Sequence, residues 1–310
     1  MIYRISPFEK ITGYKIVSRP PYEDGIFDKK VDIQKCFDTK KYDIRDLLIL
    51  KTLMKYEFLN IFNLERAVND SLKGKLKKPS YRHNIDKLLY DGAIVSYSYE
   101  GDKHSEQGSA ENTIFYGLTP AAHEFLRKKY PTMPVKYKPV KSLTDLCERY
   151  SIESILEKLS LNQWHINVAI SLKQNIKEEA YYGKRRFHFS SEFFRSYFRI
   201  RTSDNESLIV IGIPAGKNEE NFARMTEEIV FIDNAIKKVD KVRALVVIIC
   251  DNIEKSKDCA LKIKKALEFE DAMPLFTEDT YTMENQGLQN LYVCRLKDEK
   301  TVFATYDIIV

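Results

Sequence analysis

Residues 80–99 read SYRHNIDKLLYDGAIVSYSY, and this stretch joins the pattern of a helix to the pattern of a strand. Ile85 and Leu88 are spaced as one face of a helix requires, and Gly92 is the residue type that commonly follows a helix end. The seven residues that come next, AIVSYSY at 93–99, are rich in strand-forming side chains. The stretch therefore predicts a helix that ends near Gly92 and a strand directly after it.

Two further helices are predicted upstream. Apolar residues between Leu47 and Met54 recur at spacings of three and four, and Asp43 can cap the helix that they define. A second apolar set predicts a helix over 60–72. A lysine-rich turn separates that helix from Pro79-Ser80, where the third helix is expected to begin.

A second strand and a closing helix are predicted downstream. A polar loop covers residues 100–112, and residues 113–118, TIFYGL, return as a strand. Thr119 can cap a helix over 120–130. Helix, helix, helix, strand, loop and strand is the order of a winged helix-turn-helix, so we predict such a domain over residues 41–130.

The third helix carries the predicted DNA contacts, because a recognition helix enters the major groove and its outer residues meet bases and phosphates. Six basic residues and one acid lie within residues 71–90. Arg82 is suited to guanine and Asn84 to adenine, while the lysines of the preceding turn suit phosphates. Lys103 and His104 in the loop between the strands could reach the DNA backbone or the minor groove. The predicted DNA-binding residues are Lys73, Lys75, Lys77, Lys78, Ser80, Tyr81, Arg82, Asn84, Lys87, Lys103 and His104.

Prolines divide the chain into domains. Residues 131–139, PTMPVKYKP, contain three prolines, which block helix continuation and favour extended chain. We therefore predict a linker over 131–141 and a second domain over 142–310. Residues 1–40 are predicted as an N-terminal arm with one short strand near residues 13–17.

Charge is distributed unevenly between the two parts. Residues 1–141 carry 26 basic and 18 acidic residues, a net charge of +8, and residues 142–310 carry 24 and 27, a net charge of −3. A basic module joined to a mildly acidic one indicates that the first part binds a polyanion. A solvated basic surface is the alternative interpretation.

The second domain alternates helices and strands. Residues 143–159 predict a helix, and residues 162–172 predict a strand because apolar residues partly alternate there. The other predictions are strands at 184–189, 195–201 and 207–213, a helix at 218–239, a buried strand at 242–250, a helix at 256–269 and a strand at 291–296. This order resembles the restriction-endonuclease-like fold. The predicted fold class is thus α+β or α/β, with a winged helix followed by a restriction-endonuclease-like α/β domain.

In that fold, carboxylates and a lysine on two adjacent strands hold a divalent metal that activates water. The matching strand here, LIVIGIP at 208–214, has Gly212 and Pro214 where two of these groups should fall. Asp204 and Glu206 lie nearby, but a turn explains them without catalysis. We therefore predict that the domain is inactive and serves dimer or partner contacts.

Several other classes of function are not expected. The five cysteines show no C-x-x-C spacing, no phosphate-binding P-loop occurs, and no histidine pair has i, i+4 spacing. We therefore predict no catalytic residue, metal or cofactor, and a protein that is not an enzyme. The longest apolar run, Ala244–Cys250, is far below the roughly 20 residues of a membrane span. The N-terminus lacks the apolar stretch of a secretory signal, so a cytoplasmic protein without membrane contact is expected.

Three stretches of the first domain are similar to the replication-relaxation family of bacterial plasmids and integrative conjugative elements. They are DIRDLLIL at 43–50, RHNIDKL at 82–88 and FYGLTP at 115–120. The resemblance covers roughly residues 40–250. Family members often carry an acid-x-acid-x-Gly-Thr-like stretch after the central strand, where this chain reads GIPAGK at 212–217. The resemblance implies a DNA-binding accessory protein without that metal chemistry.

The function expected from the residues and the resemblance together is non-enzymatic binding of double-stranded DNA. It would serve plasmid replication, relaxosome assembly or regulation of conjugative transfer. The expected partners are double-stranded DNA, a second copy of the chain, and a relaxase or other transfer or replication proteins. Two alternatives remain open, namely a metal-dependent nuclease of the PD-(D/E)xK type and a transcription regulator that responds to a ligand.

Overall fold

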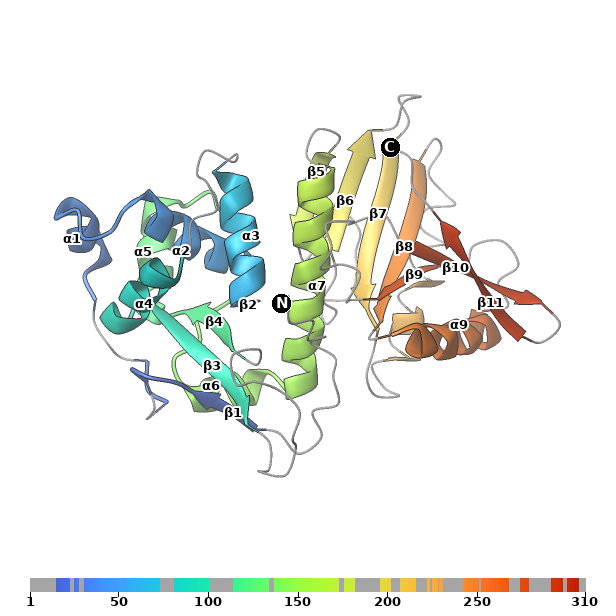
Figure 1. Ribbon diagram of the computed structural model, residues 1–310, viewed down its shortest axis with the longest axis horizontal. Coiled ribbons are helices and arrows are strands. Elements are labelled where there is room, and N and C mark those ends of the chain that lie inside the picture. The colour runs from blue at the N-terminus through green and yellow to red at the C-terminus, as the bar shows by residue number, and fades with distance from the viewer. Residues whose placement is uncertain are drawn as a thin grey trace. The chain divides into compact units, whose positions relative to one another are not determined.

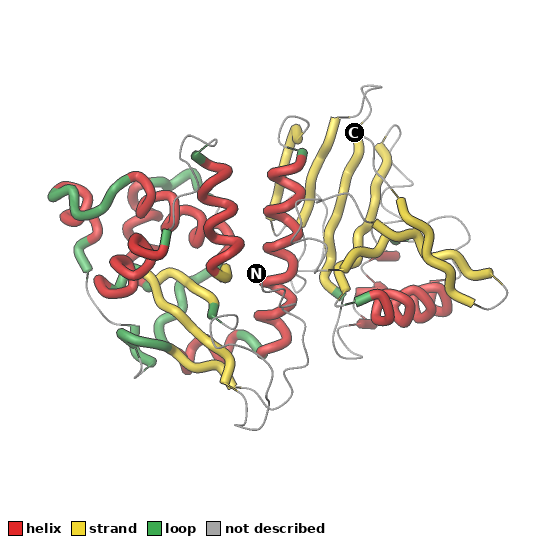
Figure 2. The backbone as a smooth tube through the Cα atoms, viewed as in Figure 1, coloured by secondary structure: helices red, strands yellow, loops and turns green. Residues whose placement is uncertain are grey.

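A computed structural model of the 310-residue chain describes seventeen segments of it. These are residues 15–22, 25–27, 31–72, 81–100, 114–133, 137–172, 176–181, 196–201, 207–215, 222–223, 225–227, 229–230, 242–250, 252–267, 274–278, 291–297 and 300–306. The chain divides into two compact units at the bond between Ile155 and Leu156. The N-terminal unit is mainly helical with a small sheet, and the C-terminal unit is built on a large sheet (Figures 1 and 2).

The N-terminal unit contains the helices and strands that the sequence predicts between residues 43 and 130. Its elements are β1 (Lys15–Ser18), α1 (Ile33–Asp38), α2 (Ile44–Tyr56), β2 (Leu59–Asn60), α3 (Ile61–Ser71), α4 (Arg82–Asp91), β3 (Ile94–Glu100), β4 (Phe115–Leu118), α5 (Pro120–Lys129) and α6 (Leu143–Arg149). The predicted order of three helices, a strand, a second strand and a closing helix is confirmed for the described residues.

Local sequence signals fix the ends of these helices. The Asp43 carboxylate accepts hydrogen bonds from the backbone N–H groups of Arg45 and Asp46, and the Asp46 carboxylate accepts one from the backbone N–H of Asp43. α4 ends at Gly92, whose φ of 78° lies in the left-handed region that glycine adopts without a steric penalty. α5 begins with Pro120, where a missing N–H costs nothing.

A four-stranded antiparallel sheet in the order β1-β3-β4-β2 completes the N-terminal unit. The segment predicted as an arm takes part in this unit where it is described, because β1 pairs along β3 and Ile16 is buried. α1 also packs on α5 through stacked rings of Phe37 and Phe125. The described part of residues 1–40 is therefore not a separate arm.

The segment predicted as a linker also packs against the N-terminal unit where it is described. The Tyr137 hydroxyl donates a hydrogen bond to the Leu53 carbonyl at 3.0 Å, and Val140 is buried. The backbone N–H of Leu143 donates to the Gly25 carbonyl at 2.8 Å. The division of the chain falls inside a helix beyond residue 150. Tyr137 and Val140 pack against the N-terminal unit rather than forming a solvated linker.

The C-terminal unit is a seven-stranded sheet with helices. Its elements begin with α7 (Ile152–Ser171), which starts in the preceding unit, and continue with β5 (Ile176–Tyr181), β6 (Ser196–Arg201), β7 (Ser207–Pro214), β8 (Val242–Cys250), α9 (Ile253–Leu267), β9 (Leu275–Glu278), β10 (Leu291–Lys297) and β11 (Lys300–Tyr306). The described residues within 222–230 are helical. The predicted strand at 162–172 is wrong, because α7 runs through it, and the predicted strand at 184–189 lies outside the described residues.

The strands of this sheet lie in the order β11-β10-β9-β8-β7-β6-β5. β7 pairs with β8 in parallel and β8 with β9 in parallel, while every other pair is antiparallel. Parallel neighbours require crossover connections, which residues 215–241 and α9 supply. The observed class is thus a mixture of helices and sheets.

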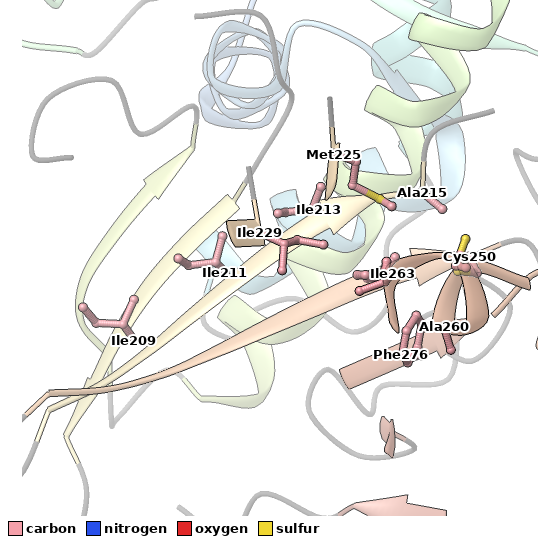
Figure 3. Close-up of a cluster of buried hydrophobic side chains, with 12 residues drawn as sticks. Ile209, Ile211, Ile213, Ala215, Met225, Ile229, Cys250, Ala260, Ile263 and Phe276 are labelled. Atoms are coloured by element: carbon pink, nitrogen blue, oxygen red, sulfur yellow. The ribbon is translucent and has the colours of Figure 1, made fainter. Parts of the chain in front are cut away.

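Both faces of β7 are buried, each by a different layer. Ile209, Ile211 and Ile213 line one side of the strand and pack in an apolar cluster with residues of the 222–230 helix and α9 (Figure 3). On the other side, Gly212 lies under the ring of Trp164 from α7. The sheet therefore forms the middle layer between α7 and the other helices.

Candidate nucleic-acid interface

The outward side of α4 carries four exposed side chains that are polar or aromatic. Arg82, His83 and Asp86 are exposed, and Tyr90 is 76% exposed. Residues four apart fall on the same side of a helix, so Arg82, Asp86 and Tyr90 form one stripe. Ile85 and Leu88 lie on the opposite side and are buried, as their spacing predicts. The helix therefore presents a guanidinium, an imidazole, a carboxylate and a phenol to solvent.

Two of the predicted DNA contacts are used inside the protein instead. Asn84 is only 5% exposed, and its side-chain amide donates a hydrogen bond to the Asp46 carboxylate at 2.8 Å. The Lys87 ammonium lies 2.6 Å from the same fully buried carboxylate and also donates to the Lys41 carbonyl at 3.1 Å. Because these groups hold α4 against the first turn of α2, they are not directed outward.

Tyr81 is likewise buried, although it immediately precedes α4. Its hydroxyl donates a hydrogen bond to the Asn69 side chain of α3 at 2.8 Å. Burial raises the pKa of this hydroxyl, while the charge of Arg45 lowers it. Tyr81 thus anchors the start of α4 on α3 and does not reach the outer surface.

The other predicted contacts lie outside the described residues. They are Lys73, Lys75, Lys77, Lys78 and Ser80 before α4, and Lys103 and His104 between β3 and β4. Among the described candidates, Arg82 alone is exposed. The structure therefore brings Arg82 together with three residues that the sequence reasoning missed, namely His83, Asp86 and Tyr90. The helical period counted from Arg82 would have found the last two.

Charged residues in the first turns of α4 act on Tyr116 of β4, an inner strand of the small sheet. Burial raises the pKa of the Tyr116 hydroxyl on β4, the charge of Asp86 raises it further, and Arg19 and Arg82 lower it. These groups are therefore close enough to Tyr116 to act on it electrostatically. The backbone N–H of Arg19 bonds the Ser96 carbonyl of β3 at 3.0 Å, which fixes this arginine at the sheet. Two arginines and one carboxylate thus act electrostatically on the same tyrosine of β4.

The described part of the chain offers no grouping suited to a metal ion. Within it, no set of three or more His, Cys, Asp and Glu side chains comes together. A Cβ atom added at Gly212 would lie 2.3 Å from a ring carbon of Trp164. No carboxylate could therefore replace this glycine without displacing the buried tryptophan. Across the same residues, no helix combines the length and apolar character that crossing a membrane demands.

Comparisons of the chain with protein-family models, with curated proteins and with solved structures found no match.

Proposed function

We propose that the N-terminal unit is a winged helix-turn-helix that binds double-stranded DNA through the outward side of α4. The order of its elements supports this, because α2, α3 and α4 are followed by the β3–β4 pair that would form the wing. In such domains the third helix lies in the major groove. The loop residues 101–113 would form the tip of the wing.

One observation carries the proposal: α4 is fixed from its inner side and polar on its outer side. Asn84 and Lys87 bind Asp46, while Arg82 at the first turn is exposed. The N-terminal half of a recognition helix meets base edges, and arginine can donate two hydrogen bonds to guanine. The lysines of residues 73–78 precede this turn and would contact phosphates.

We infer a restriction-endonuclease-like fold for the C-terminal unit, and the order of its elements supports this inference. From α7 the order is helix, three antiparallel strands, helix and a parallel strand. Gly212 under Trp164 leaves no space for a metal ligand at that position of β7. We infer a scaffold for a second copy of the chain or for a partner. The protein would act as a DNA-binding accessory factor in plasmid replication, relaxosome assembly or conjugative transfer.

The test uses Arg82→Ala in the full chain. DNA fragments tiling the genetic neighbourhood of the protein first identify a preferred site by fluorescence anisotropy. Arg82→Ala should then weaken binding to that site by about 10-fold to 100-fold, as expected for roughly 1–3 kcal/mol of base discrimination. Binding to unrelated DNA should change little. Lys138→Ala, which removes an exposed charge outside α4, is the control.

Equal affinities of Arg82→Ala and Lys138→Ala for the preferred site would overturn the role of α4.

The nuclease alternative is tested by incubating supercoiled plasmid with the protein and Mg²⁺ or Mn²⁺. We expect no cleavage. Nicking that is lost in Asp204→Ala or Glu206→Ala would favour the nuclease instead.

A further inference from the structure

The C-terminal end of α5 carries three consecutive basic side chains, and a fourth from α2 joins them. Arg127, Lys128 and Lys129 are all exposed in the last turn of α5. The Lys51 ammonium of α2 lies 4.3 Å from the ring centre of Tyr130, the residue directly after α5. We call Lys51, Arg127, Lys128 and Lys129 the α5 basic patch.

Aromatic rings hold two of these cations in place. Lys51 lies over Tyr130, and Lys129 lies 5.2 Å from the ring centres of both Phe37 and Phe125. Phe37 and Phe125 stack with ring centres 5.7 Å apart and planes 14° apart. A ring face attracts an ammonium group and packs against its aliphatic stem, but it carries no net charge. The positive charges are therefore positioned without being neutralised.

Carboxylates compensate little of this charge. Lys128 pairs with Glu124 at 2.7 Å, but the two side chains are 77% and 68% exposed, so water and salt screen the pair strongly. Among the described residues, Lys51, Arg127 and Lys129 make no ion pair. Three uncompensated cations thus lie around the C-terminal end of α5, two from that helix and one from α2.

The helix dipole explains only part of this arrangement. Basic residues in the last turn of α5 interact favourably with the negative end of that helix. Lys51 lies in the middle of α2 (Ile44–Tyr56), however, where no helix end attracts a cation. Its position over Tyr130 brings a fourth charge to the end of α5 without a dipole to favour it.

The patch lies away from the side of α2 that holds α4. Asp46 of α2 contacts Asn84 and Lys87, so its direction marks that side. Lys51 follows five residues later, which at 3.6 residues per turn is a rotation of about 140° around the helix. The α5 basic patch is therefore a separate surface from the outward stripe of α4.

We propose that the α5 basic patch is a second anion-binding surface, which takes the phosphate backbone of DNA outside the segment contacted by α4. Exposed cations at the end of α5, with the half-buried Lys51 of α2 beside them, match a chain of phosphates, since each contact releases counterions. A protein partner would need an apolar centre in its interface. The large apolar side chains exposed in the described part, Ile26, Ile44 and Tyr90, all lie outside the patch. This inference rests on the proposed binding of DNA, but it concerns the end of α5 and not α4.

The experiment measures the salt dependence of binding to a long duplex in the full chain. The patch variant is Lys51→Gln, Arg127→Gln and Lys129→Gln combined. Its matched control combines Lys255→Gln, Lys257→Gln and Lys262→Gln on α9, which removes the same number of positive charges. Lys262 lies 5.2 Å from the ring centre of Phe222, so the control also removes a lysine that packs on an aromatic ring. The patch variant should lower the slope of log affinity against log salt by about 2–3, at roughly 0.9 per phosphate contact. The control should keep the slope, and both melting temperatures should stay within a few degrees of the original.

The outcomes separate this inference from the role of α4. An equal slope in the patch variant and in its α9 control overturns the patch. A reduced slope in the patch variant, together with an unchanged affinity in Arg82→Ala, supports the patch and overturns the role of α4. An unchanged slope in the patch variant, together with a reduced affinity in Arg82→Ala, supports the role of α4 and overturns the patch. If the unmodified chain binds no duplex at low salt, both proposals fail.

Discussion

Asp46 of α2 is the main partner of the polar side chains on the inner side of α4. It is fully buried, and its carboxylate accepts hydrogen bonds from Asn84, from Lys87 and from the backbone N–H of Asp43. One carboxylate thus caps α2 and also binds two side chains of α4. Because a buried ion is costly unless every contact is made, this residue should be among the least replaceable of the N-terminal unit.

We expect Asp46→Ala to destabilise the N-terminal unit by about 3 kcal/mol, because it leaves the Lys87 ammonium largely buried without its partner. Thermal unfolding followed by far-ultraviolet circular dichroism measures the change. Glu124→Ala is the control, since it removes a carboxylate at a similar 2.7 Å from a lysine, but on an exposed pair. Similar melting curves for the two variants would contradict the role given to Asp46.

Gly212 is a second position where a single atom decides the packing. A Cβ atom there would lie 2.3–2.8 Å from three ring carbons of the buried Trp164, so Gly212→Ala forces the ring or the strand to move. We expect a loss of roughly 3 kcal/mol from such overpacking. Trp164 is the single tryptophan of the chain, so its fluorescence during urea unfolding reports on the C-terminal unit directly.

Gly117→Ala is the matched control for this prediction. Gly117 also lies within a strand, but a Cβ atom there would meet ring carbons of Phe58 and Tyr97 at 3.4 Å, an ordinary contact distance. We expect this variant to keep its unfolding midpoint within about 1 kcal/mol of the original protein. If Gly212→Ala unfolds at the same urea concentration as Gly117→Ala, the ring of Trp164 does not pack tightly against Gly212.

Single residues of α4 show what the sequence could and could not predict. Its inner apolar residues follow from spacing alone, and Ile85 and Leu88 are buried as expected. A polar residue type, however, does not reveal whether its partner is DNA or another part of the protein. Asn84 and Lys87 bind Asp46, a residue about forty positions earlier, and such a pairing leaves no local pattern in the sequence.

At the scale of elements, helices with one exposed face were predicted well and α7 was not. α2 to α5 each have a buried and an exposed side, so apolar spacing reveals them. α7 is buried at every position from Ile155 to Val168, including polar residues such as Asn162 and His165. Without a solvent side, apolar residues lose the helical period, and the partial alternation near Trp164 favours a strand instead.

Strands β5, β9 and β11 were also missed. β9 has only four residues, and β5 reads IKEEAY, in which charged residues interrupt any apolar alternation. β8 was predicted with its full length, because its run of β-branched residues is typical of a strand covered on both faces. Edge strands and short strands depend on their neighbours for definition, so the sequence alone indicates them weakly.

α5 carries a buried histidine that should make stability depend on pH. His123 is 2% exposed, and burial lowers its pKa, with a further lowering by the charge of Arg127. Its ring lies 5.3 Å from that of Tyr137. The unfolded chain, with a usual pKa of about 6.5, then binds a proton more readily than the folded chain. The contribution of the neutral His123 to the free energy of unfolding is therefore fully present above about pH 6.5, and it decreases as the pH falls below that value.

His123→Leu removes this titration, so its stability should decrease less between pH 7.5 and pH 5.5 than that of the unmodified protein. Urea unfolding at both pH values measures the difference between the two proteins, which cancels the effect of other titrating groups. His83→Gln removes an exposed histidine of α4 and is the control. A pH dependence in His123→Leu as steep as in the unmodified protein would show that His123 is not held neutral by burial.

At the scale of the whole molecule, the sequence predicts two units but misplaces their boundary. Three prolines within residues 131–139 indicate an extended chain, and the described residues of that segment are not helical. An extended segment can nevertheless pack as tightly as a helix, and composition does not distinguish the two cases. Tyr137 and Val140 fill the N-terminal unit, and α6 contacts β1.

This packing predicts that a fragment of residues 10–151 folds and that a fragment of residues 10–134 does not fold stably. The shorter fragment loses buried side chains such as Val140 and Leu146, together with the hydrogen bond of 2.9 Å from the Tyr150 hydroxyl to Glu57. Each buried apolar side chain contributes about 1.5–3 kcal/mol, so the loss approaches the whole stability of a small domain.

Thermal unfolding of both fragments by circular dichroism measures the difference. We expect one cooperative transition for residues 10–151, and a broad transition at lower temperature for residues 10–134. α4 and β4 belong to both fragments, so any difference arises from residues 135–151. If both fragments melt at the same temperature, the proline-rich segment is a linker after all, and the contacts of Tyr137 and Val140 add nothing. If the longer fragment alone folds, those contacts make residues 135–151 part of the N-terminal unit.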